Sequence, residues 1–209
     1  MLHKKSYKES DIISIKKKVK RKVSKKRYQH ILGVAYTAAA LAMRYEEDIL
    51  KAQIAGVLHD CAKGIRSDKM VELCDHYHIT ISDVERKNTE LLHAKLGGFL
   101  AMKRYHIQDK EIIGAILAHT TGHPNMTTLE KIIFIADYIE PGRYKQKNLK
   151  MIRYEAFRDL DACLLMILRD TLEYLQETGT EIDPMTQQTY EYYTEQLNKT
   201  EKGEKNESI

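Results

Sequence analysis

The sequence predicts an all-α protein. Apolar residues recur at three- and four-residue spacing in one segment after another, which is the pattern of an amphipathic helix. The 209 residues include only ten glycines and three prolines, so few positions interrupt a helix. No convincing alternation of apolar and polar residues marks a β-strand, and no segment repeats.

Size and composition indicate one folded domain in a reducing compartment. With 209 residues, of which 43% are hydrophobic, the chain is long enough to bury a sizeable core. No window approaches the ~18 apolar residues that a membrane span requires, and the N-terminus lacks the apolar segment of a secretory signal. The cysteines, Cys61, Cys74 and Cys163, form no CxxC pair, which argues against a disulfide framework and a zinc knuckle. We therefore expect a cytoplasmic protein without a membrane partner.

Positive charge is concentrated at the N-terminus. The chain carries a net charge of +4, yet residues 1–27 hold twelve Lys and Arg against only two acids. Subtracting these from the totals of 34 and 30 leaves 22 basic and 28 acidic side chains, so the remainder is acidic. We divide the chain into a basic arm (1–26), a domain (27–198) and a polar tail (199–209). Such an arm can touch nucleic acid or anionic lipid, but a solvated helix face or a loose tail is the simpler interpretation, and no nucleic-acid partner is expected.

Three helices are predicted between residues 50 and 117, each from an apolar stripe at helical spacing. They cover 50–59, 89–104 and 109–117. The first ends in the dipeptide His59-Asp60, and Asp109 stands where an N-cap begins the third.

The second half of the chain reads as a loop followed by three helices. The segment 120–126 contains a glycine and a proline that break the chain. Residues 127–130 then match a capping box, and an apolar helix follows until Pro141 must end it. A long helix over 155–177 and a short one beyond Pro184 complete the fold.

Four histidines and two aspartates distinguish these helices. Each lies inside or at the end of an apolar helical segment: His30, His59, Asp60, His93, His119 and Asp137. A single histidine on an apolar face is usually a hydrogen-bonded core residue, and the dipeptide alone also fits a helix cap. Asp137 is harder to explain in that way, because its neighbours are apolar and a buried carboxylate needs a cation close by. One ligand per helix is how a bundle builds a metal site in its core.

A second kind of metal-binding bundle has to be weighed. Glu90 and His93 match the ExxH spacing of ferritin-like di-iron carboxylate proteins. That architecture needs two such motifs and two further glutamates, and only one motif is present. Glu90 is more simply an acidic residue in the first turn of a helix, where the helix dipole favours it.

Five strings, in order along the chain, resemble the HD phosphohydrolase superfamily, and more closely its YqeK-like bacterial branch, the symmetrical diadenosine tetraphosphate hydrolases. They are RYQHILGV, AGVLHDCAK, LLHAKLGG, LAHTTG and ADYIEPGR, and the similarity runs from about residue 27 to residue 184. The resemblance implies an HD-domain helical bundle with a metal site in its core. It also implies an enzyme that cleaves diadenosine tetraphosphate into two ADP by means of a metal-activated water.

The resemblance further implies roles for individual residues. Metal ligands would be His30, His59, Asp60 and Asp137, while His93 and His119 would complete a second metal position or contact the phosphates. The nucleotide site would be lined by His30, Asp60, Cys61, Ala62, Lys63, His93, His119, Thr120, Asp137 and Arg143. The catalytic residues would be Asp60 and Lys63. The expected cofactor is a divalent metal, iron first, with Mn, Co, Zn and Mg also compatible with His and Asp ligands.

The residues themselves support phosphate chemistry. Lys63 follows Asp60 by three positions and so lies on the same helical face, where a cation can meet the charge of phosphoryl oxygens. Two alternatives stay open: an HD-superfamily nucleotidase or triphosphohydrolase that acts on a mononucleotide, and a nucleotide-binding regulator without turnover. The oligomeric state is also open, with a homodimer as the assembly to consider.

Overall fold

The structure confirms the all-α prediction. The computed structural model describes residues 7–206, with side chains through residue 199, and every regular element in that part of the chain is a helix. The elements are α1 (Glu9–Lys20), α2 (Lys25–Arg44), α3 (Ile49–Leu58), α4 (Ser67–His76), α5 (Asp83–Lys87), a 3₁₀ turn η1 (Thr89–Leu91), α6 (Leu92–Tyr105), α7 (Lys110–Ala118), α8 (Thr128–Ile139), α9 (Leu149–Glu155), α10 (Leu160–Glu177) and α11 (Pro184–Asn206). No helix in the described part of the chain is long and apolar enough to cross a bilayer.

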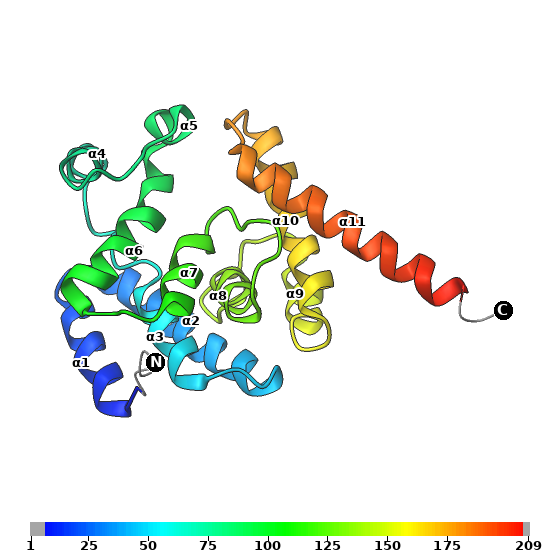
Figure 1. Ribbon diagram of the computed structural model, residues 1–209, viewed down its shortest axis with the longest axis horizontal. Coiled ribbons are helices and arrows are strands. Elements are labelled where there is room, and N and C mark those ends of the chain that lie inside the picture. The colour runs from blue at the N-terminus through cyan, green and yellow to red at the C-terminus, as the bar shows by residue number, and fades with distance from the viewer. Residues whose placement is uncertain (1–6, 207–209) are drawn as a thin grey trace, which may run out of the picture.

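Helix α8 forms the centre of the bundle. Figure 1 shows it nearly end-on, with α2, α3, α7 and α10 packed around it. Apolar side chains cover most of its circumference, so it is buried on several sides at once. Thr127 caps its start and exchanges hydrogen bonds with Glu130, which confirms the predicted capping box, and it ends at Ile139, before Pro141. Asp137 is thereby fixed at the middle of the molecule.

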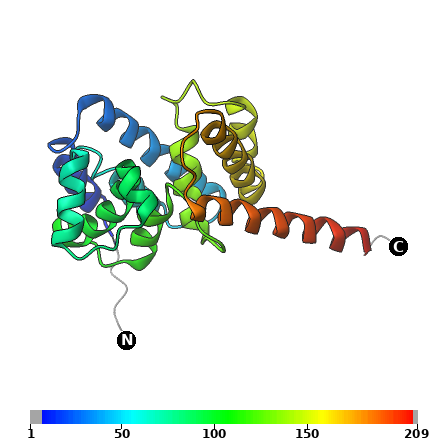
Figure 2. The ribbon, with the colours of Figure 1, turned by 90° about the horizontal axis from the view of Figure 1, so that it is seen from above.

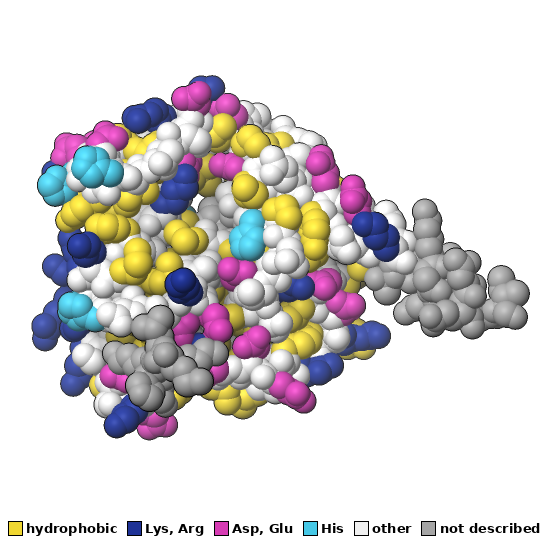
Figure 3. All heavy atoms as spheres, in the orientation of Figure 1, with side chains coloured by type: hydrophobic (Ala, Val, Ile, Leu, Met, Phe, Trp, Pro, Cys, Tyr) yellow, Lys and Arg dark blue, Asp and Glu magenta, His cyan; other side chains and the backbone are white. Residues whose placement is uncertain are grey.

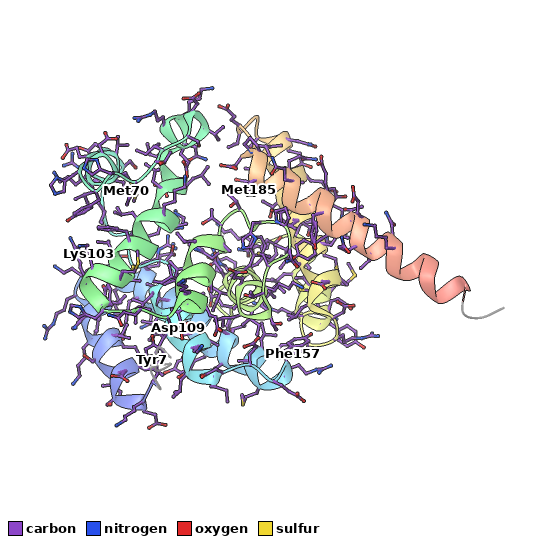
Figure 4. All side chains as sticks on the ribbon, in the orientation of Figure 1. Tyr7, Met70, Lys103, Asp109, Phe157 and Met185 are labelled. Atoms are coloured by element: carbon purple, nitrogen blue, oxygen red, sulfur yellow. The ribbon has the colours of Figure 1, made fainter. Side chains whose placement is uncertain are left out.

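Helix α3 places the His59-Asp60 dipeptide at the core. It packs closely along α2, and at Gly56 a Cβ atom would lie 2.8 Å from the Cα atom of Ala35, so only glycine allows this approach. The other end of α3 is tied to α7 by the buried Lys51, whose Nζ lies 2.8 Å from Asp109 Oδ2. Asp109, labelled in Figure 4, also caps α7 as predicted.

Part of the predicted N-terminal arm belongs to the fold. Helix α1 buries Ile12, Ile15 and Val19 and packs against α3, so the expectation of a loose tail is wrong for these residues. The alternative expectation, a solvated helix face, fits the opposite side, where lysines such as Lys17 and Lys20 are exposed. Figure 3 shows Lys and Arg side chains along the edge of the molecule where α1 and the end of α6 lie.

The C-terminal third also differs from the prediction. The long helix begins at Leu160, where Asp159 caps it, and the preceding residues form the separate helix α9. The final helix is not short: α11 has 23 residues, continues into the predicted tail, and extends past the body in Figures 1 and 2. Its buried face includes Thr186, Thr189 and Tyr193, a stripe without aliphatic residues that hydrophobic periodicity does not reveal. The division into arm, domain and tail otherwise stays a prediction.

The packing of α1 can be tested with two isoleucines on the same helix. Ile15 is buried and Ile13 is 54% exposed. We expect Ile15→Ala to lower the free energy of unfolding by about 2–4 kcal/mol, because it removes buried methyl groups and leaves a cavity. Ile13→Ala should change it by less than about 0.5 kcal/mol. Urea denaturation measures both, and equal values would mean that α1 is not packed on the domain.

Candidate metal and substrate site

The predicted ligand candidates converge although they come from separate elements. His30 lies in the second turn of α2, His59 and Asp60 follow α3, His93 begins α6, His119 ends α7, and Asp137 lies in α8. They form three overlapping groups in which the potential ligand atoms all lie within 4.8 Å of one another. The groups are His30–His59–Asp60, His59–His119–Asp137 and Asp60–His93–His119.

Asp60 connects the two halves of this cluster. Its Oδ2 atom lies 3.6 Å from His30 Nε2 and 3.4 Å from His59 Nε2. Its Oδ1 atom lies 3.3 Å from His93 Nε2 and 3.8 Å from His119 Nε2. A carboxylate with two histidines near each oxygen can serve two adjacent cation positions.

Asp137 completes the first half of the cluster. Its Oδ1 atom lies 3.0 Å from His30 Nε2 and 3.8 Å from His59 Nε2. His30, His59, Asp60 and Asp137 therefore face one position, and His93 and His119 face a second position beside it. The structure thus brings together all six residues that the sequence singled out.

Each histidine is held so that its Nε2 atom points into the cluster. The Nδ1 atoms of His59 and His119 lie 2.7 Å from the carbonyl oxygens of Gly56 and Ile116, and His93 Nδ1 contacts the Glu90 carbonyl. A carbonyl oxygen only accepts hydrogen bonds, so Nδ1 must carry the proton, and in the neutral ring Nε2 keeps a free lone pair. This is the tautomer that a metal ligand needs.

The inward-facing nitrogens have the features of cation ligands. The Nε2 atoms of His30 and His59 are buried and make no hydrogen bond of acceptable geometry, which is costly for a polar atom. The Nε2 atoms of His93 and His119 lie 2.9 Å apart, so two lone pairs confront each other unless a proton or a cation lies between them. A divalent cation at each of the two positions would satisfy these nitrogens, and the donor set therefore fits a metal centre.

The electrostatics favour ionised carboxylates and a neutral His93. For His59, burial lowers the pKa, but Asp60 and Asp137 reverse this shift and raise it. Burial raises the pKa of Asp60, but His59, His119 and His93 together outweigh burial and hold that pKa well below its usual value. Burial also raises the pKa of Asp137, and contact with histidine again reverses the shift and lowers it. Burial, together with His119, lowers the pKa of His93 to about 3. Near neutral pH the site therefore presents ionised carboxylates, and His93 is neutral.

Two arginines bind the outer sides of the carboxylates. Arg27 Nη1 lies 2.7 Å from Asp60 Oδ2, and Arg143 Nη2 lies 2.6 Å from Asp137 Oδ1. Both side chains are about one-third exposed, so each joins the buried cluster to solvent. They are placed to meet an anionic substrate at the entrance.

Lys63 also reaches the entrance, but it has an anionic partner there. Its Nζ atom lies 2.6 Å from Glu90 Oε2. Glu90 is therefore the partner of Lys63, and its carbonyl orients His93, so it does not act as the glutamate of a ferritin-like di-iron site. The pair is accessible to solvent, because the Glu90 side chain is 61% exposed, and a phosphate can displace the carboxylate.

Two of the predicted substrate-binding residues lie in the core instead. Cys61 is buried, and its thiol donates to the Gly97 carbonyl at 3.7 Å. Burial raises the pKa of this thiol to about 12, so it stays protonated. Ala62 is fully buried. Neither residue is among those that line the described cavities around the cluster.

Sequence reasoning missed Glu140, which orients His30. This carboxylate is only 4% exposed, and its Oε1 atom lies 3.1 Å from His30 Nδ1. Its Oε2 atom accepts from Gly142 N at 2.6 Å, and a Cβ atom at Gly33 would lie 2.3 Å from the same oxygen. The spacing to Asp137 was the available signal, since two acids three residues apart on an apolar helix share one face.

The cluster opens into a central cavity of about 370 Å³, lined by the predicted Thr120 as well as by the cations described above. Three further cavities adjoin it. The α11 cavity, about 500 Å³, shares Thr120 with it and extends to Asp183 and to Met185, which Figure 4 labels at the start of α11. The α2 cavity, about 630 Å³, lies between the start of α2 and the end of α8. The α10 cavity, about 610 Å³, lies between α8, α10 and the segment 143–147.

This fold and site agree with the comparison to known proteins. The family model of the HD domain matches residues 27–142, and the chain belongs to the HD domain family. Within that family it is similar to the symmetrical bis(5'-nucleosyl)-tetraphosphatase of Halalkalibacterium halodurans, with 38% identity over 172 residues, 82% of this chain and 91% of the relative. The enzyme of the same name from Bacillus subtilis is 36% identical over 83% of this chain and 92% of its own length.

A solved structure shows the same fold. It is described as a predicted HD superfamily hydrolase involved in NAD metabolism from Clostridium acetobutylicum. It is 40% identical to this chain and superimposes with a TM-score of 0.85 over 88% of this chain and 97% of the other. The resemblance found in the sequence is confirmed at the level of the family.

The position of Glu140 leads to a test of its role. Glu140→Gln preserves size but removes the charge that accepts from His30 Nδ1, and we expect metal affinity to fall by about 10- to 100-fold. Metal titration against a competing chelator measures the change. Glu130→Gln is the matched control, because Glu130 is also a buried carboxylate but pairs with His123 at 3.3 Å, outside the cluster. An equal loss in both variants would contradict a specific role for Glu140.

Proposed function

We propose that this chain hydrolyses dinucleoside tetraphosphates symmetrically, converting diadenosine tetraphosphate and water into two ADP. The observation that carries the proposal is a single cluster of four imidazole nitrogens and two carboxylates that opens into a cavity rimmed by Arg27, Lys63 and Arg143. Similarity at 36–38% identity to proteins named symmetrical bis(5'-nucleosyl)-tetraphosphatase supports the substrate. A tetraphosphate carries about one negative charge per phosphate, which suits a cationic, metal-binding cavity.

The proposed metal ligands are those that the sequence indicated. His30, His59, Asp60 and Asp137 would hold one divalent cation, and His93 and His119 would hold a second together with Asp60. We propose iron, while imidazole and carboxylate ligands also suit Mn, Co and Zn. Bound there, the cation supplies Lewis acidity, which makes hydroxide available near neutral pH and offsets negative charge on the phosphoryl oxygens.

The protein groups position the substrate and the attacking water. Asp60 accepts a hydrogen bond from the water and orients it toward phosphorus, while Lys63 and Arg143 donate to the phosphoryl oxygens as charge builds on them. The new bond joins the water oxygen to the second phosphorus from one nucleoside, and the bond to the bridging oxygen breaks. One ADP leaves from each side of the broken bond, and both protons of the water pass to solvent as the two new terminal phosphates ionise.

The first nucleoside is proposed to occupy the α11 cavity. This cavity joins the central one at Thr120, beside His119, and its lining includes Leu91, Leu117 and Met185, which suit an apolar base. Asp183 and Met185, on either side of the start of α11, line the same cavity.

The alternatives from the sequence are less well supported. A mononucleotide hydrolase would need one nucleoside cavity, whereas several cavities surround this centre, and the named relatives act on dinucleotides. A regulator without turnover does not require the complete set of ligand candidates. A cytoplasmic location and a homodimer stay predictions.

The product pattern tests the reaction. Incubation of the metal-loaded protein with diadenosine tetraphosphate should give ADP alone, because attack is directed at the second phosphorus. Chromatography of the nucleotides over time measures this. Equal amounts of AMP and ATP would mean attack at an outer phosphorus, and release of phosphate from mononucleotides alone would favour the other hydrolase class.

Metal removal tests the centre itself. Chelation should abolish hydrolysis, and it should lower the melting temperature, because a ligand at 100 times its dissociation constant stabilises the folded state by about 3 kcal/mol. Asp137→Asn should reproduce both effects without a chelator. Restored activity on adding back Fe, Mn, Co or Zn identifies the metals that function. A protein whose activity and melting temperature are both unaffected by chelation would have no such centre.

A further inference from the structure

We infer that the α10 cavity binds the nucleoside of the departing half of the substrate, with the ring of Tyr174 as a stacking surface. The inference rests on the proposed function and gives the second nucleoside of the dinucleotide a binding site. A symmetrical substrate has two identical nucleosides, and one of them needs a site beyond the α11 cavity. Of the three neighbouring cavities, the α10 cavity shares the most lining residues with the central cavity.

The two cavities share four lining residues. These are Tyr138 at the end of α8, Arg143 and Gln146 in the segment after it, and Thr171 of α10. By comparison, the α11 cavity shares only Thr120 with the central cavity, and it lies on the side of His119. A bound dinucleotide can therefore extend from the α11 cavity through the central cavity into the α10 cavity, with its phosphates at the cluster.

The lining of the α10 cavity suits a nucleoside rather than a phosphate. Tyr138 and Tyr174 provide aromatic surface for a base, and Gln146 and Thr171 provide donors and acceptors for its edge. The tyrosine of α10 is 63% exposed, so its ring is open to a partner. The volume of the α10 cavity, about 610 Å³, lies within the usual range for ligand sites.

The charges of this cavity balance. Its three basic residues, Arg143, Lys145 and Lys147, face three acidic ones, Asp170, Glu173 and Glu177. Lys147 Nζ lies 2.7 Å from Glu173 Oε2, and the Asp170 carboxylate accepts from Asn148 at 3.0 and 3.1 Å. A balanced lining gives no net attraction for phosphate and is compatible with a neutral nucleoside.

The α2 cavity is the rival location, and its chemistry is different. Its lining contains Lys26, Arg27 and Arg143 but only one acid, Glu140, which is occupied by His30 and Gly142. No aromatic side chain other than His30 lines it. Such a surface suits phosphate or solvent better than a base.

Arg143 connects the cluster to the α10 cavity. Its Nε donates to the Asp137 carbonyl at 2.9 Å while Nη2 holds the Asp137 carboxylate, and its own carbonyl accepts from Arg153 at 2.9 Å. The guanidinium is therefore fixed at the boundary between the two cavities. It is placed to hold the diphosphate that links the broken bond to the second nucleoside.

The experiment compares two exposed tyrosines against two ligands. We expect Tyr174→Ala to lower kcat/KM for diadenosine tetraphosphate by about 5- to 100-fold, the range for loss of one base–aromatic stack. Tyr154→Ala is the matched control, because Tyr154 is also 63% exposed but lies on α9 and lines none of the described cavities. It should leave kcat/KM unchanged.

Adenosine 5'-tetraphosphate provides the second arm, because it lacks the departing nucleoside. Its inhibition constant against diadenosine tetraphosphate, which is measurable whether or not it is cleaved, should be the same in wild type and Tyr174→Ala. Equal weakening of both ligands, or no change for the dinucleotide, would overturn the assignment to this cavity. If Gln29→Ala lowered kcat/KM for the dinucleotide and Tyr174→Ala did not, the nucleoside would lie in the α2 cavity, which Gln29 lines. Failure of the wild type to form ADP would instead contradict the proposed function.

Discussion

The carboxylate of Asp60 is the contact on which the site depends. It lies just after α3. Two histidines lie near each of its oxygens, and Arg27 contacts Oδ2. A buried charge of this kind is unfavourable unless it is paired, and here four elements, α2, α3, α6 and α7, supply its partners. The packing of α3 against α2, including the close approach at Gly56, therefore fixes the position of the carboxylate around which the other ligand candidates are arranged.

Backbone carbonyls orient three of the four imidazoles, and only the fourth, His30, needs a carboxylate for this purpose. Helix ends leave carbonyl groups without helical partners, and His59 and His119 use such carbonyls, three residues earlier, to fix Nδ1. His93 does the same with the 3₁₀ turn before α6. His30 lies inside α2, where the preceding carbonyls are used by the helix itself. Glu140, directly after the end of α8, takes over that function.

The sequence predicted the ligand cluster because polar residues in apolar helices stand out against their neighbours. Asp137 is the clearest case, and the capping box at Thr127 and the cap at Asp109 were visible for the same local reason. What could not be predicted depends on tertiary contacts. The apolar residues of α1 are hidden among lysines, the buried face of α11 consists of threonine and tyrosine, and Glu140 resembles an ordinary residue before a proline until α2 is placed beside it.

The arginines link the metal centre to the substrate through charge. As the structure stands, Asp60 and Asp137 each have one guanidinium within 2.7 Å, which offsets their charge. When the same carboxylates share their charge with a divalent cation, their attraction for the arginines weakens. Phosphoryl oxygens are then the strongest remaining acceptors near Arg27 and Arg143, and a guanidinium can bind them in a bidentate manner. Arg143 also borders the α10 cavity. In the proposed reaction, the arginine that pairs with Asp137 before substrate binds is therefore the one that would meet the departing diphosphate.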